Sequence, residues 1–178
     1  MKQFLLLLSV AFLLSCASQP SAKIPTTFDS DSSDGMVIGT IAFKNEKPIF
    51  NGYLFYYAGK DDTKITHNKM ISISPEQVVA MKFNPNFYDQ EKAVYYFSIT
   101  QPPGDYKFVN LGIFENGGFI QSNQHLPMNI EFNIEKGKIK YLGEIYVDYR
   151  KQSVMLTDQE SRDLPKINTA FPQLKIEK

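Results

Sequence analysis

Residues 99–114 read ITQPPGDYKFVNLGIF, and this stretch places a sharp corner between two strands. Pro103 presets φ for the first central position of a type II turn, and Gly104 can take the positive φ that the second position requires. Tyr106 then begins a run of aromatic and β-branched residues, which is typical of a strand. Asp105 is the only side chain of catalytic type in the turn, and a lone turn aspartate is usually solvated. The stretch therefore predicts a structural corner formed by Pro103, Gly104 and Tyr106.

Six more segments on either side of this corner carry strand patterns. Period-two alternation is typical of half-buried strands, and turn signals separate the segments. No long helical pattern lies between them, which disfavours a parallel sheet. The sequence thus predicts an all-β, antiparallel Greek-key β-sandwich of about seven strands, with a short C-terminal helical segment. The six segments are MVIGTIAF (36–43), GYLFYYAG (52–59), KMISIS (69–74), AVYYFSIT (93–100), MNIEFNIE (128–135) and KIKYLGEIYVD (138–148).

The same alternation predicts which side chains face the core. In the strand after the corner, Val109, Leu111 and Ile113 share one face. Further along, the residues EKGK at 135–138 predict a tight hairpin turn, because Gly137 can take a positive φ. Both expectations fix how neighbouring strands line up.

The corner also carries a family resemblance. The segment PPGDYKFVNLGIF (102–114) resembles the Pro-Gly-x-Tyr segment of transthyretin-like and carboxypeptidase-regulatory-like bacterial domains. The runs VIGTIAF (37–43) and NEKPIFNGYLFYY (45–57) are similar to their first strand and to the approach to their second. The resemblance spans residues 36–150. It implies a Greek-key sandwich in which the Tyr106 hydroxyl bonds to the backbone a few residues upstream, the arrangement called a tyrosine corner.

The N-terminus, MKQFLLLLSVAFLLSC, decides the compartment. The basic Lys2 and the apolar stretch at 4–14 are typical of a signal peptide, and the stretch is shorter than the roughly 20 residues of a bilayer span. The ending LLSC at 13–16 resembles the lipobox of bacterial lipoproteins. The resemblance implies a signal peptide at 1–15 that is cut before Cys16. It also implies a diacylglycerol on the Cys16 thiol and a fatty acid such as palmitate on the new amino group.

Lipid chains on Cys16 predict a membrane-anchored protein of the bacterial cell envelope, because two or three chains hold a protein where one does not. In the lipoprotein family, an Asp after the lipidated Cys retains the protein in the inner membrane. Ala17 stands at that position here. For a Gram-negative source, the resemblance therefore implies the outer membrane.

The predicted organisation has three parts after the signal. Residues 16–35, the lipidated Cys and a stretch rich in Ser, Pro, Thr and Asp, are expected to form a disordered tether. Residues 36–156 form the β-sandwich domain, and residues 157–178 form a helical segment docked on it. Thr157 and Glu160 match a capping box, and Pro165 is expected to kink or split the helix. The apolar stripe expected to face the sandwich is Leu164, Ile167, Phe171 and Leu174.

Composition and motifs bound the chemistry. Without Lys2 the mature chain has 18 basic and 19 acidic side chains, a net charge near −1, so no basic surplus points to nucleic acid. Cys16 is the only cysteine, which leaves none for disulfides or a thiol nucleophile. His67 and His125 lie far apart without ligand spacing, so no metal site and no cofactor are expected. No catalytic motif is present, which favours a non-enzymatic protein.

Aromatic residues are abundant, with ten Tyr and fourteen Phe. Since neighbours in a strand face opposite ways, Tyr56 and Tyr96 are expected to point away from the main core. They are candidates for a binding face, or for packing under the C-terminal helix. The predicted function is an envelope lipoprotein whose sandwich acts as a binding or structural module for a protein or glycan partner. The alternative is an envelope hydrolase with a carboxylate-based site.

Overall fold

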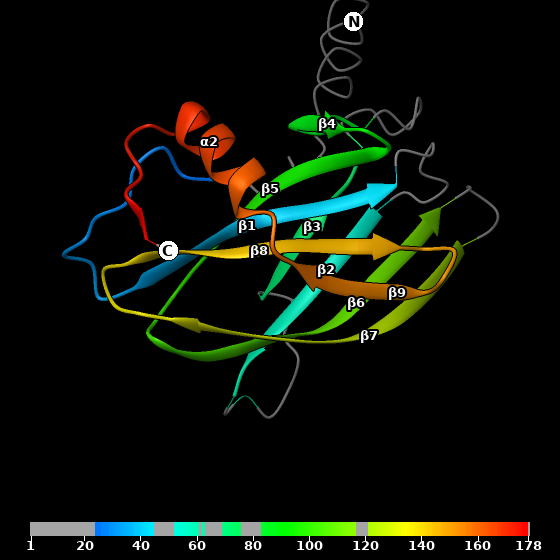
Figure 1. Cartoon of the computed structure of the whole chain (residues 1–178). Helices are drawn as coiled ribbons and strands as arrows, with labels where there is room; N and C mark the ends of the chain where they lie inside the picture. The colour runs from blue at the N-terminus through cyan, green and yellow to red at the C-terminus, as the bar shows by residue number, and fades with distance from the viewer. Residues whose placement is uncertain are drawn as a thin grey trace, which may run out of the picture.

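The structure, a computed structural model, describes residues 24–44, 52–60, 62, 69–75, 83–116 and 121–177. It confirms the predicted all-β sandwich with one short helix (Figure 1). All seven predicted segments are strands. Cys16, the predicted lipidation site, lies outside the described residues, and so does His67.

The first sheet has the order β10-β8-β1-β5-β4, with β9 also paired to β8. Strand β1 pairs antiparallel with β5 and parallel with β8, so this sheet is not purely antiparallel as predicted. Strands β9 and β10 share the outer edge of β8, because each is short and pairs with a different half of it. The strands of this sheet are β1 (Gly35–Lys44), β4 (Phe87–Asp89), β5 (Lys92–Gln101), β8 (Ile139–Asp148), β9 (Ser153–Thr157) and β10 (Ile176–Glu177).

The second sheet is antiparallel throughout, with the order β3-β2-β6-β7. The chain passes between the sheets from β1 to β2, from β3 to β4, from β5 to β6 and from β7 to β8. The sequence did not predict β4, β9 or β10, which have three, five and two residues. The strands of the second sheet are β2 (Gly52–Gly59), β3 (Met70–Ile73), β6 (Gly104–Asn116) and β7 (Gln121–Ile134).

Two sequence expectations about register were wrong. A β-bulge between Phe108 and Asn110 shifts the alternation of β6, so Phe108 lies in the core and Val109 does not. The turn before β8 does form, with Gly137 at φ 70° and a hydrogen bond from Lys138 N–H to the Glu135 carbonyl. It is not a hairpin, however, because β7 and β8 belong to different sheets.

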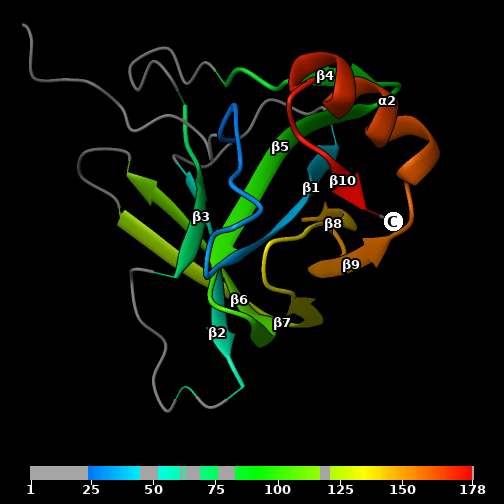
Figure 2. The same ribbon diagram turned by 90° about the vertical axis from the view of Figure 1, so that its left-hand side faces the viewer.

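Two apolar clusters hold the molecule together. The main core lies between the sheets and includes Phe55, Phe97 and Phe108, all fully buried. The second core lies on the outer face of the first sheet, where helix α2 (Glu160–Ala170) covers it (Figure 2). The first sheet is therefore buried on both faces. The buried members of the second core are Ile24, Met36, Ile38, Tyr96, Ile139, Ile167 and Leu174.

The C-terminal segment forms β9, α2 and β10 in turn. The capping box was wrong: Thr157 still belongs to β9, and the Asp158 carboxylate accepts from the Glu160 N–H at 2.9 Å. Pro165 does not split the helix as expected: it lies inside one continuous element, on its exposed side. Three of the four residues of the predicted stripe face the sheet: Ile167 and Leu174 are buried, and Phe171 packs on the second core. Leu164 belongs to neither core, and Phe171 and Leu174 follow the end of the helix.

The predicted tether is shorter than expected. From Ile24 onward the chain lies on the domain, with Ile24 buried in the second core and Phe28 packed against it. The Gly137 N–H donates to the Asp34 carbonyl at 2.9 Å, which ties this segment to the turn before β8. Two apolar side chains among many polar ones were too weak a signal to find this docking.

Candidate functional site

The corner between β5 and β6 has the hydrogen bond expected of a tyrosine corner. The Tyr106 hydroxyl donates to the Pro102 carbonyl oxygen at 2.9 Å. The predicted type II turn was wrong, because the bend falls on Pro102 and Pro103. Gly104 is already the first residue of β6, and its φ of 157° is close to extended instead of about +80°. Pro103, Gly104 and Tyr106 thus form the corner, and the hydrogen bond of Tyr106 stabilises it.

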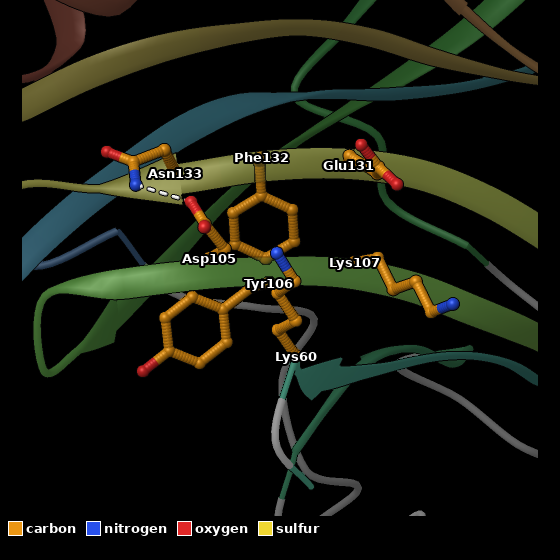
Figure 3. Close-up of a pocket in the computed structure, with 7 residues that line it drawn as sticks. All are labelled: Lys60, Asp105, Tyr106, Lys107, Glu131, Phe132 and Asn133. Carbon is orange, nitrogen blue, oxygen red and sulfur yellow. Dashed lines mark hydrogen bonds between the residues drawn. The ribbon is translucent and has the colours of Figure 1, made fainter.

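A groove of about 490 Å³ opens beside this corner (Figure 3). We call it the corner groove. Asn133 donates its amide N–H to the Asp105 carboxylate at 2.8 Å across β6 and β7, and Lys107 lies opposite Glu131. Two lysines therefore balance two acids around it. Its lining residues are Lys60, Asp105, Tyr106, Lys107, Glu131, Phe132 and Asn133.

Two lining residues of the corner groove, Tyr106 and Phe132, are almost fully buried, and their rings belong to the main core. Tyr106 and Phe132 stack with centroids 5.6 Å apart and planes inclined by 17°. The Lys69 ammonium lies 5.6 Å from the centre of the Tyr106 ring, within range of a cation–π contact. Burial raises the pKa of Tyr106, and Lys69 opposes this shift in part. The phenol is therefore neutral at physiological pH, and its hydroxyl donates a hydrogen bond to the backbone. It is not a base.

A second polar site lies where α2 meets the first sheet. We use the name Arg162 cluster for Arg162, the three acids that it contacts and the residues that donate to two of these acids: Asp89, Glu144, Asp163, Thr40, Lys92 and Tyr141. The Arg162 guanidinium donates to Asp89 of β4 at 2.8 Å and to Glu144 of β8 at 2.6 Å. Its Nε donates to Asp163 at 2.7 Å. The Glu144 and Asp163 side chains are fully buried, so this one cation joins three acids from three elements.

Neutral and cationic groups complete the cluster. Thr40 and Tyr141 donate to Asp163 at 2.7 and 2.6 Å, and Lys92 donates to Glu144 at 2.7 Å. Burial lowers the pKa of Arg162, but its hydrogen bonds to the three carboxylates outweigh this and raise it above its ordinary value. Burial and the bond to Asp163 raise the pKa of Tyr141. Arg162 therefore stays positively charged, and Tyr141 stays protonated and donates a hydrogen bond to Asp163.

Sequence reasoning missed the Arg162 cluster because its members come from residues 40, 89, 92, 141, 144, 162 and 163, with no local spacing. A cavity of about 490 Å³ lies next to the cluster and shares Asp89 and Lys92 with it. Its walls carry both charge signs, including Glu91, Asp148 and Lys151. The cavity gathers charged side chains that the sequence places in turns and on outward strand positions.

The two aromatic candidates, Tyr56 and Tyr96, do not form one face. Tyr96 is 8% exposed and lies in the second core, 6.1 Å from the ring of Phe171. It is buried under the C-terminal segment and cannot be part of a binding face. Tyr56 lies on β2 in the other sheet, half-buried beside Gly112. Of the two uses predicted for this pair, Tyr96 has the packing role.

Within residues 24–177, apart from the undescribed gaps, no group of three or more His, Cys, Asp or Glu side chains is placed to hold a metal ion. His125 shares a hydrogen bond with Asn110 at 2.8 Å. In the same part of the chain, no helix has the length and apolar character needed to span a membrane.

Comparison with known proteins finds no matching family model and no matching curated protein. Among solved structures, the chain is similar to part of a leucine-rich repeat protein from Bacteroides thetaiotaomicron VPI-5482, with 10% sequence identity and a TM-score of 0.40. The aligned region covers 65% of this chain and 14% of that one.

Proposed function

We propose that this chain is a lipid-anchored protein of a bacterial cell envelope, whose β-sandwich is a non-enzymatic binding or structural module. The observation that carries the proposal is the LLSC sequence at 13–16, followed after a short interval by a domain that begins at Ile24. Eight residue steps separate Cys16 from Ile24, which limits their separation to about 29 Å. The lipid on Cys16 would therefore hold the domain close to the membrane, in the outer membrane for a Gram-negative source.

The Arg162 cluster supports a non-enzymatic role. A carboxylate-based hydrolase needs one acid that is free to give up a proton and another that is free to attack or to activate water. Glu144 and Asp163, the two fully buried acids, both accept hydrogen bonds from Arg162 and from further donors. Their arrangement is that of a structural ion cluster, and no observation favours the hydrolase alternative over the binding module.

The corner groove is the surface best suited to binding. Its two lysines and two acids balance, which suits a ligand without net charge, and its amide and carboxylate groups offer both donors and acceptors. The rigid corner behind it holds the lining residues in place. A polar segment of an envelope protein or a neutral glycan has this chemistry.

Replacement of Cys16 tests the anchor. In the native host, Cys16→Ser should abolish incorporation of labelled fatty acid and release the protein from the membrane fraction, because the lipid thioether cannot form. Ser18→Ala, two residues away, is the matched control and should stay labelled and membrane-bound. A Cys16→Ser protein that pellets and labels like the wild type would refute the anchor.

Site-specific photo-crosslinking tests the groove. A photoreactive residue at position 107 should yield a discrete crosslinked product in intact envelopes, whereas one at Lys151, which is 80% exposed in the turn after β8, should not. Lys107→Glu replaces a positive charge in the groove by a negative one. This substitution should abolish the crosslink formed by a photoreactive residue at position 133. Equal crosslinking at the groove position and at the control position would show that the partner does not bind at the groove.

A further inference from the structure

The outer face of the second sheet carries exposed aromatic residues, whereas helix α2 covers the outer face of the first sheet (Figure 2). Ile113 points into the main core, so its neighbour Phe114 points outward, where it is 36% exposed. The Phe114 ring leans across β2, because Gly52 opposite it has no side chain: a Cβ atom there would come within 2.7 Å of the ring. The ring thus offers apolar surface to a ligand on this face.

His125, exposed on β7, has a fixed hydrogen-bonding direction. The Asn110 amide nitrogen lies 2.8 Å from His125 Nδ1. An amide nitrogen can only donate, so Nδ1 accepts, and in the neutral imidazole the proton is then on Nε2. Among the described residues none bonds to Nε2. The pair therefore offers a donor, His125 Nε2–H, close to an acceptor, the Asn110 amide oxygen, and a hydroxyl group can bond to either.

The surface around this pair carries no charge. The outward positions of β2, β6 and β7 that surround Gly112 include no Lys, Arg, Asp or Glu. An anionic or cationic ligand would lose water here without gaining a charged partner. We use the name outer patch for the polar and aromatic members of this surface: Tyr56, Asn110, Phe114, Asn123 and His125.

The dimensions of the outer patch allow one ligand to contact several members. Phe114 lies opposite Asn123, so His125, two residues on, is its diagonal neighbour, at a distance of about 7–8 Å. The same face continues along β6 into the corner groove, where Lys107 and Asp105 take the next outward positions. A chain-like ligand that follows β6 can therefore reach both surfaces.

We propose that the outer patch binds a neutral glycan chain, with one sugar ring packed on Phe114 and hydroxyl groups bonded to His125 Nε2–H and to the Asn110 amide oxygen. A sugar ring has faces of C–H groups that pack on aromatic rings, and a rim of hydroxyls that both donate and accept. It needs no counter-charge. This inference rests on the proposed binding module and gives it a ligand class.

Calorimetric titration of the whole mature chain, in a detergent without a sugar headgroup, tests the proposal. The probes are four neutral oligosaccharides: maltohexaose, cellohexaose, mannohexaose and xylohexaose. At least one should bind the wild type with a Kd below about 1 mM. Phe114→Ala should weaken this binding about tenfold, because the packing surface is lost, and Phe114→Tyr should preserve it. His125→Ala should weaken it about fivefold, because the donor is lost.

Tyr88→Ala is the matched control, since it removes an aromatic side chain that is 62% exposed on β4 of the first sheet, and it should bind like the wild type. Circular dichroism checks that each variant folds. A wild type that binds none of the four probes would overturn the glycan inference, whereas crosslinking at position 107 would still decide on the binding module. Folded Phe114→Ala and His125→Ala proteins with unchanged affinity, together with a loss in Lys107→Glu, would place the glycan in the corner groove and overturn the outer patch.

Discussion

The main core and the second core are built in different ways. The main core joins two sheets, and its members come from strands that alternate apolar and polar residues, as in Met128 to Ile134 of β7. The second core joins one sheet face to both ends of the described chain, from Ile24 to Leu174. A face of a sheet that has no partner sheet must be covered by other elements, and here the two chain ends cover it.

The strand between the two cores shows the difference most clearly. Val37 and Ile41 of β1 lie in the main core, and Met36 and Ile38 lie in the second core. Strand β1 is therefore buried from Gly35 to Ala42 and reads as an apolar run interrupted only by Thr40, like a strand of a parallel sheet. Strand β7 has one solvated face and alternates. The run in β1 indicates that something covers both of its sides.

The largest expected effect comes from a substitution that weakens the attachment of helix α2 over the second core. Asp163→Ala should lower the free energy of unfolding by about 3–5 kcal/mol, because it removes one partner of a buried ion cluster and leaves the fully buried Thr40 hydroxyl without its acceptor. Urea unfolding measures the loss. Glu91→Ala removes an exposed pair with Lys44 and should cost at most about 1 kcal/mol. A comparable loss in both variants would show that the buried cluster contributes no more than a surface pair.

The next effect concerns the main core and appears in alkali. Burial raises the pKa of Tyr53 to about 12, whereas an unfolded tyrosine titrates near 10. Between these values the folded protein keeps a proton that the unfolded chain loses, so stability is full below pH 10 and falls as pH rises. The loss from Tyr53 alone reaches about 2 kcal/mol at pH 12.

Denaturation at several pH values tests this assignment. The stability of Tyr53→Phe should fall less steeply above pH 10 than that of the wild type, because the group that loses its proton is gone. Tyr88→Phe changes a tyrosine that is 62% exposed and should keep the wild-type slope. Identical slopes for all three proteins would assign the alkaline loss to groups other than Tyr53.

The smallest effect concerns the corner that closes the main core at one end. Tyr106→Phe removes the hydroxyl that donates to the Pro102 carbonyl and should cost about 1–2 kcal/mol. The ring still stacks on Phe132, so the packing is kept and only the hydrogen bond is tested. Thermal and urea midpoints measure the change. An unchanged midpoint would mean that the Tyr106 hydrogen bond does not stabilise the corner.

Most of the main core could be predicted from the sequence, because period two is a local signal. The errors came where one residue breaks the period: the bulge at Phe108 moved Val109 off the core face. Strands β4, β9 and β10 were missed because two to five residues carry too little pattern, and only pairing with β5 and β8 makes them strands.

The second core and the Arg162 cluster could be predicted only in part. The apolar stripe that includes Ile167 and Leu174 predicted a docked segment, and this segment packs on Tyr96. Nothing in the sequence joins Asp89 to Glu144 or to Arg162, because contacts between residues tens of positions apart leave no spacing to read. The corner groove was equally hidden, although Tyr106 at its wall was among the predicted corner residues.

The pairing of β1 has a mechanical consequence. If Cys16 carries the lipid that we propose, a pull from the membrane would enter the domain at Ile24 and reach β1 at Gly35. Strand β1 lies between β5 and β8, and its hydrogen bonds to both run across the direction of the strand. Tension along β1 would load these two ladders together in shear instead of opening them one bond at a time. A tether at Cys16 would thus act on a strand that is hydrogen-bonded along both edges.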